Sequence, residues 1–88
     1  MELLELRNEI DRIDNELVRL FGQRMEISAR IAQYKKAHDL PVFVPEREAQ
    51  KLADMAQKAE PDLAEYTQQL YRLLFELSKN YQKKLNDK

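Results

Sequence analysis

Residues 3–36 have the sequence LLELRNEIDRIDNELVRLFGQRMEISARIAQYKK, in which apolar residues recur at spacings of three and four. Side chains with this spacing return to one face of an α-helix, so the stretch predicts a single amphipathic helix over about residues 3–37. We call its apolar face the stripe, whose members are Leu3, Leu6, Ile10, Ile13, Leu17, Leu20, Ile27, Ile31 and Tyr34.

Prolines divide the remainder of the chain. The segment HDLPVFVPERE contains Pro41 and Pro45, which favour extended backbone in the residues before them, so it predicts a connecting loop. Pro45 suits the first turn of a second helix over about residues 45–59. The segment EPD that follows ends this helix and starts a third over about residues 62–84. The sequence predicts one all-α domain, residues 1–88, with three helices and a very long first one.

The length of the first helix determines the expected assembly. About 34 helical residues extend roughly 50 Å, which exceeds the diameter of a compact domain of this size. Two shorter helices can cover only part of the stripe, and a chain of 88 residues has a small core. We therefore predict an intertwined homodimer in which the first helices of two chains pair. A helical dimerisation module without catalytic activity would explain the stripe equally well.

Composition excludes several classes of function. Fifteen Lys and Arg residues against sixteen Asp and Glu residues give a net charge of -1, which argues against binding to nucleic acid or acidic membranes. The absence of Cys excludes disulfides and thiolate metal sites, and the lone His38 has no second ligand at a suitable spacing. No signal peptide or membrane span is recognisable. We expect a cytoplasmic protein without a bound metal.

Several cations share the inward side of the first helix. Arg24 interrupts the stripe, and Lys35 follows eleven residues later, at about 20° of rotation and roughly 16 Å of rise, so both point to one side and could bind one small anion. Arg24 alone could instead pair with an acid across the dimer. Arg7 lies about 25 Å from Arg24 along the axis, too far to share a small ligand within one chain. Antiparallel pairing that crosses near residue 18 would place Arg7 of one chain between Arg24 and Lys35 of the other.

The other two helices add polar residues to the same predicted cavity. Glu48 continues the inward line of the second helix, with Arg47 beside it. Ser78 and Gln82 extend the apolar line of Phe75 on the third helix as neutral hydrogen-bonding groups. Each residue taken singly is commonly an ordinary surface residue. Their occurrence together on inward faces of three helices predicts one anion-binding cavity.

Three segments, LRNEIDRIDNELVRLFGQRMEISARIAQYKK, PVFVPEREAQKL and LYRLLFELSKNYQ, resemble in order and spacing the all-helical class of chorismate mutases. The resemblance covers nearly the whole chain. It implies a homodimer of three-helix chains in which each active site takes one arginine from the partner chain. The implied reaction is the rearrangement of chorismate to prephenate in phenylalanine and tyrosine biosynthesis, without a cofactor, a metal or a covalent intermediate.

By position, the resemblance also implies roles for individual residues. Arg7 is similar to the partner-chain arginine and Arg24 to the same-chain arginine, both of which bind substrate carboxylates. Lys35 resembles the lysine that contacts a carboxylate and the ether oxygen of the breaking bond. Gln82 resembles the glutamine that donates to that oxygen, and Glu48 the acid that holds the ring hydroxyl.

Arg47 resembles a supporting arginine, and Ser78 the serine near a carboxylate. Two positions depart from the family pattern. Val44 stands where some relatives carry an Asp near the ring hydroxyl, so only its backbone amide can contribute there. Lys79 occupies a position that is apolar in some relatives, which leaves the shape of that pocket wall open.

Two alternatives and one extension accompany this interpretation. A lyase that removes pyruvate from isochorismate could use the same scaffold and much the same cations. A dimerisation module with a degenerate pocket would show no turnover. Because the family often occurs fused or docked to other enzymes of aromatic biosynthesis, the domain could also have such a partner.

Overall fold

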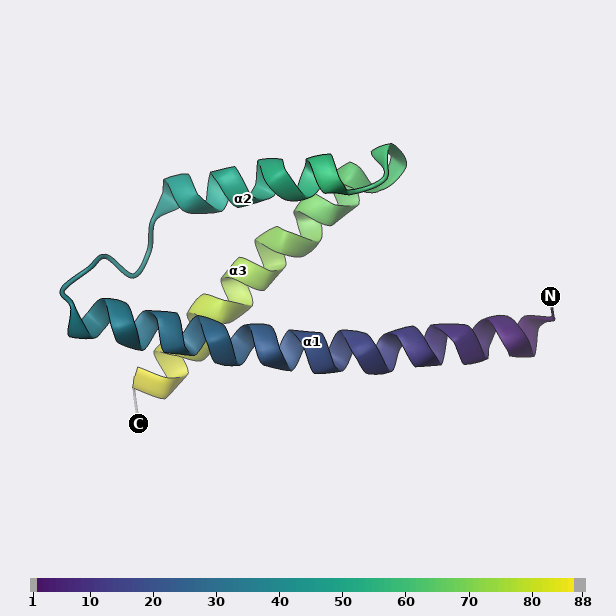
Figure 1. Ribbon diagram of the computed structural model, residues 1–88, viewed down its shortest axis with the longest axis horizontal. Helices are drawn as coiled ribbons and strands as arrows, with labels where there is room; N and C mark the ends of the chain where they lie inside the picture. The colour runs from purple at the N-terminus through teal and green to yellow at the C-terminus, as the bar shows by residue number, and fades with distance from the viewer. Residues whose placement is uncertain (1, 87–88) are drawn as a thin grey trace.

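The computed structural model describes residues 2–86 and contains three α-helices (Figure 1). Helix α1 spans Leu3–Ala37, α2 spans Pro45–Lys58 and α3 spans Ala64–Asn86, and the described residues contain no strand. The predicted all-α class with three helices and a long first helix is confirmed. None of the described helices is both long and apolar enough to cross a membrane.

The helix ends differ from the predicted ones around the third proline. Helix α2 ends at Lys58 because the next residue, Ala59, has extended backbone. Residues Pro61–Leu63 form a separate 3₁₀ turn, η1, in which the Leu63 amide donates to the Glu60 carbonyl at 2.8 Å. This i to i+3 bond characterises a 3₁₀ turn and delays the start of α3 to Ala64 instead of 62.

A Schellman motif ends α1 and sets the direction of the loop to α2. The Leu40 amide donates to the Lys35 carbonyl at 2.8 Å, and the Asp39 amide to the Lys36 carbonyl at 3.4 Å. Asp39 has a φ of 56°, in the left-handed region that Asp tolerates better than most residues. The loop then returns toward α1, where the Lys35 ammonium donates to the Val42 carbonyl at 3.4 Å.

Helix α3 connects the other two helices. It packs on both α1 and α2, whereas α1 and α2 do not pack on each other within residues 2–86. Figure 1 shows α3 running from the end of α2 across to the C-terminal half of α1. The Arg24 to Ser78 contact lies at this crossing. Residues from all three helices and from the loop can therefore face a common space beside α3.

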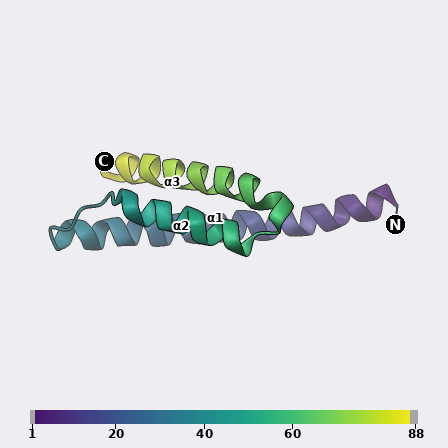
Figure 2. The same ribbon diagram turned by 90° about the horizontal axis from the view of Figure 1, so that it is seen from above.

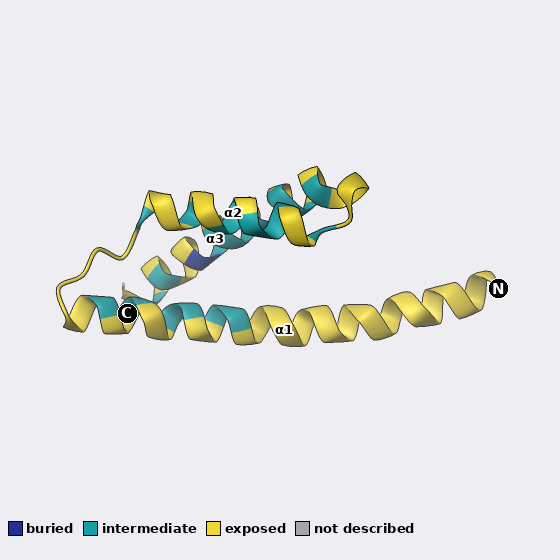
Figure 3. Ribbon diagram, turned by 45° about the horizontal axis from the view of Figure 1, so that its top comes forward, coloured by how far each residue is buried: buried dark blue, intermediate teal, exposed yellow. Residues whose placement is uncertain are grey.

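The N-terminal half of α1 extends beyond the other helices (Figure 2). Every residue from 2 to 23 is exposed, including the stripe members Ile10 at 56% and Leu17 at 55% (Figure 3). The radius of gyration is 16.2 Å, against about 12 Å for a compact chain of this length. No apolar side chain in the described residues is buried. A single chain thus leaves its stripe uncovered.

Candidate functional site

A cavity of about 550 Å³ lies among the C-terminal half of α1, loop residues 42–44, the first turns of α2 and the C-terminal half of α3. Apolar walls come from residues such as Ile27, Ile31 and Phe75. Of the eight predicted site residues, seven line this cavity: Arg24, Lys35, Val44, Arg47, Glu48, Ser78 and Gln82.

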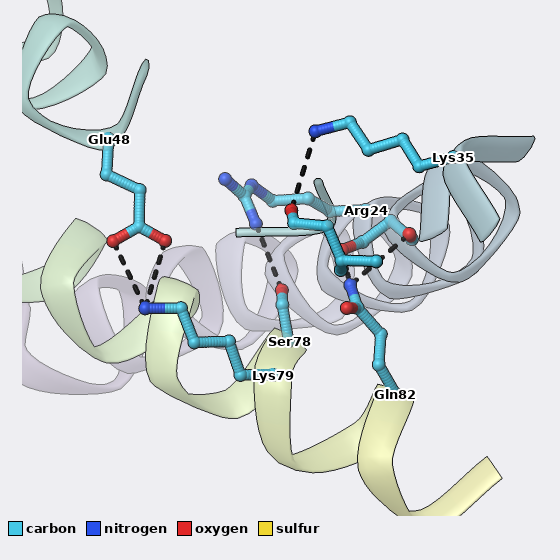
Figure 4. Close-up of polar contacts among 8 residues, drawn as sticks. Arg24, Lys35, Glu48, Ser78, Lys79 and Gln82 are labelled. Carbon is cyan, nitrogen blue, oxygen red and sulfur yellow. Dashed lines mark hydrogen bonds and ion pairs between the residues drawn. The ribbon is translucent and has the colours of Figure 1, made fainter. Parts of the chain in front are cut away.

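Arg24 projects from α1 toward α3 (Figure 4). Its guanidinium carbon lies 5.6 Å from the ring centroid of Tyr71 and 5.8 Å from that of Phe75, within the range of cation–π interactions. Its Nη1 donates to Ser78 Oγ at 3.4 Å. No acid among residues 2–86 forms an ion pair with it. The aromatic rings therefore hold the guanidinium at the cavity while its charge stays available for an anion.

Ser78 and Gln82 join α3 to α1 at the base of the cavity. Ser78 is the one buried residue of the described chain, at 7% exposure, and its hydroxyl also donates to Met25 Sδ at 3.6 Å. The Gln82 amide nitrogen donates to Ser28 Oγ at 2.8 Å and to the Ser28 carbonyl at 3.3 Å. These bonds fix the rotamer of Gln82 beside the cavity and keep its donor group at the surface of α1.

Glu48, the one acid of residues 2–86 that lines the cavity, forms an ion pair with Lys79. Lys79 Nζ lies 3.1 Å from Glu48 Oε2 and 3.2 Å from Glu48 Oε1 (Figure 4). It also lies 3.9 Å from the centroid of the Phe43 ring. The sequence assigned no role to Lys79. Glu48 and Lys79 are 31 residues apart on different helices, so no local spacing could have indicated the pair.

The charged lining of the cavity is strongly positive. Five cations face one acid, Glu48, although the whole chain carries a net charge of -1. Lys51, which sequence reasoning missed, follows Arg47 by one helical turn on α2, and this spacing would have placed both on one face. Such a concentration of positive charge suits a small ligand with more than one negative charge. The five cations are Arg24, Lys35, Arg47, Lys51 and Lys79.

Two predicted residues differ from the others in their placement. Val44 caps α2, and its carbonyl accepts from the amides of Arg47 at 3.1 Å and Glu48 at 3.4 Å, so its backbone lies at the cavity edge. Arg7 lies on the exposed N-terminal half of α1 and does not line the cavity. One chain does not bring Arg7 to the other site residues.

Comparison with known proteins finds one matching family model and several relatives. A protein-family model described as Chorismate mutase type II matches residues 6–83. The T-protein of Enterobacter agglomerans is 42% identical over 69 residues, which cover 73% of this chain and 18% of that protein. The bifunctional chorismate mutase/prephenate dehydratase of Aquifex aeolicus is 53% identical over 47 residues, covering 53% of this chain and 13% of that protein.

A shorter relative is the chorismate mutase of Methanocaldococcus jannaschii, which is 36% identical over 47 residues, 53% of this chain and 48% of that protein. The chain spans less than one fifth of the length of the T-protein and the bifunctional relative. No solved structure matches the chain significantly.

Proposed function

The chain belongs to the chorismate mutase type II family, and we propose that it catalyses the rearrangement of chorismate to prephenate. The observation that carries the proposal is the meeting of seven expected site residues at one cavity with five cations. Chorismate carries two carboxylates, which such a cavity would bind. A bifunctional relative joins chorismate mutase to prephenate dehydratase, so fusion or docking to another enzyme of aromatic biosynthesis is part of this proposal.

The reaction breaks one carbon–oxygen bond while one carbon–carbon bond forms within the same molecule. It needs no nucleophile, so the protein contributes orientation and charge. Arg24 binds one carboxylate, and Arg7 of the partner subunit binds the other, which holds the side chain of the substrate over the ring in a reactive conformation. A planar guanidinium suits this task because it can bind a carboxylate through two parallel hydrogen bonds.

Charge grows on the ether oxygen as its bond lengthens. Lys35 from α1 and Gln82 from α3 both donate to this oxygen. In the free protein their donors point to the Val42 carbonyl and to Ser28, so the ligand oxygen replaces acceptors that already hold these groups in place. Donors fixed before the reaction stabilise developing charge without the cost of reorganisation.

The remaining residues fix the ring. Glu48 accepts a hydrogen bond from the ring hydroxyl, and the Val44 amide assists at the cavity edge. Ser78 supports the Arg24 guanidinium beside a carboxylate, as its 3.4 Å contact with Arg24 suggests. Arg47 adds positive charge from the first turn of α2.

The assembly that we propose is an intertwined homodimer. Its support is the uncovered stripe, because residues 2–86 of one chain bury no apolar side chain and burial of apolar side chains is the main source of folding stability. A contiguous exposed apolar face of this length marks an interaction surface. Pairing of two antiparallel α1 helices near residue 18 covers the stripe and brings Arg7 of the partner subunit to the cavity.

Sedimentation equilibrium tests the dimer. We expect a mass of twice the 10.5 kDa chain, and we expect the Leu17→Asp variant to dissociate and lose much of its helical circular dichroism, because it places an unpaired charge in a buried interface. Asn15→Asp is the matched control, since residue 15 lies on the opposite face of α1. A wild-type monomer, or equal effects of the two variants, would contradict the dimer.

Incubation of the purified protein with chorismate tests the reaction. We expect prephenate to accumulate without added metal or cofactor, and the Gln82→Ala variant to lose about a hundredfold in kcat, because one donor to the ether oxygen is removed. Isochorismate is supplied in parallel, and release of pyruvate would identify the lyase instead. A wild-type protein that converts neither substrate would support a dimerisation module.

A further inference from the structure

Lys79, on α3, contacts both α2 and the loop between α1 and α2. Its ammonium contacts both carboxylate oxygens of Glu48 on α2, at 3.1 and 3.2 Å, and lies 3.9 Å from the ring centroid of Phe43 in the loop. A second, smaller cavity of about 280 Å³ shares Glu48, Phe75 and Lys79 with the main cavity. The ion pair therefore stands in the wall between the two cavities.

We propose that Lys79 determines specificity, by selecting a ring substituent that is a neutral hydrogen-bond donor and rejecting a positively charged one at the same place. The inference rests on the proposed function, in which Glu48 accepts from the ring hydroxyl. It concerns a residue to which the family resemblance assigns no role.

Any ring substituent that binds to the Glu48 carboxylate lies close to the Lys79 ammonium. A group that is hydrogen-bonded to either Glu48 oxygen lies within about 6 Å of Lys79 Nζ, given the 3.1 and 3.2 Å contacts of that nitrogen. A carboxylate has about four lone-pair sites, so Glu48 can accept from Lys79 and from a hydroxyl at once. A neutral hydroxyl meets little opposition from Lys79, whereas an ammonium group meets a like charge.

The size of this discrimination follows from the charges and their exposure. The attraction of Glu48 for an ammonium group is largely offset by Lys79, since the pair together carries no net charge. The Lys79 side chain is 46% exposed and that of Glu48 28%, so solvent weakens the repulsion. We therefore expect discrimination of about tenfold, and not the thousandfold of a fully buried pair.

The experiment compares two substrates with the Lys79→Met variant in the full chain. The substrates are chorismate and the analogue in which an amino group, protonated at neutral pH, replaces the ring hydroxyl. Methionine keeps an unbranched side chain against Phe43 but removes the charge. We expect the ratio of kcat/KM for chorismate to kcat/KM for the analogue to fall about tenfold, and Lys79→Arg to retain the wild-type ratio.

Lys51→Met is the matched control for net charge. Lys51 lines the same cavity, and neither of the two ion pairs found among residues 2–86 includes it. If Lys51→Met lowers the ratio as much as Lys79→Met, the effect is one of total charge and the inference is wrong. Raising the salt concentration should lower the wild-type ratio toward that of Lys79→Met, because both charges of the pair are partly exposed.

The outcomes separate this inference from the proposed function. A wild-type protein that does not convert chorismate overturns both. A wild-type protein that does, together with an unchanged ratio in Lys79→Met, overturns only the role of Lys79. Circular dichroism checks that the variant folds, and Lys79→Gln provides a second uncharged side chain if Lys79→Met does not.

Discussion

The Arg24→Ala variant is expected to lose a few hundredfold in kcat/KM for chorismate, which corresponds to about 3 to 4 kcal/mol of transition-state binding. The guanidinium faces the cavity and forms no ion pair with an acid of the described chain. A substrate carboxylate would therefore gain the full interaction with its charge. Arg24→Lys keeps the charge but loses the planar pair of donors, and we expect an intermediate loss. Steady-state kinetics with chorismate measure both.

Arg30→Ala provides the control for Arg24→Ala. Arg30 lies on the same helix, is exposed and does not line the cavity, so its removal should leave kcat/KM within about twofold of wild type. Arg24→Ala should lower the free energy of unfolding by only about 1 to 2 kcal/mol, because its hydrogen bond to Ser78 is long at 3.4 Å and its cation–π contacts with Tyr71 and Phe75 are modest. Wild-type kinetics in Arg24→Ala would mean that the residue serves only to pack on Tyr71 and Phe75.

Much of the fold follows from local rules. The spacing of apolar residues predicts α1 because every turn of a helix repeats the same geometry, and Pro45 marks the start of α2 because a proline fits the first helical turn. The 3₁₀ turn Pro61–Leu63 was not predicted. Its single i to i+3 bond at Leu63 leaves no periodic pattern in the sequence, so a short turn and a helix start look alike.

The site was predictable where one helix carries several of its residues. Arg24 and Lys35 could be placed on one side of α1 from their spacing alone, and both line the cavity. The pairing of Lys79 with Glu48 depends on how α3 lies against α2, and the direction of Lys35 depends on the loop that brings the Val42 carbonyl to it. Contacts of this kind come from tertiary packing, which local spacing does not encode.

The contacts within one chain give Arg7 no place in the site. It lies on the same helix as Arg24 but seventeen residues away, on the half of α1 that the other helices do not cover. Within one chain it would be an ordinary exposed arginine. Its proposed role depends on a second copy, and a test must therefore report on which chain supplies it.

Subunit complementation provides that test. Arg7→Ala and Arg24→Ala homodimers should each be nearly inactive, because every site lacks one carboxylate clamp. In a mixed dimer, one site combines the intact Arg24 of the first variant with the intact Arg7 of the second, and the other site lacks both. When the variants are unfolded together and refolded in equal amounts, about half of the dimers are mixed, so we expect about one quarter of wild-type activity.

The controls distinguish shared sites from simpler explanations. Each variant refolded alone should stay inactive, and Lys35→Ala mixed with Arg24→Ala should not recover activity, because both residues line the cavity of a single chain. Sedimentation confirms that mixed dimers form when one variant carries a mass tag. Recovery with Arg7→Ala but not with Lys35→Ala would assign Arg7 to the partner's site. Dimers that mix fully and remain inactive would place Arg7 and Arg24 in the same site of one chain, whereas an active Arg7→Ala homodimer would place Arg7 outside the site.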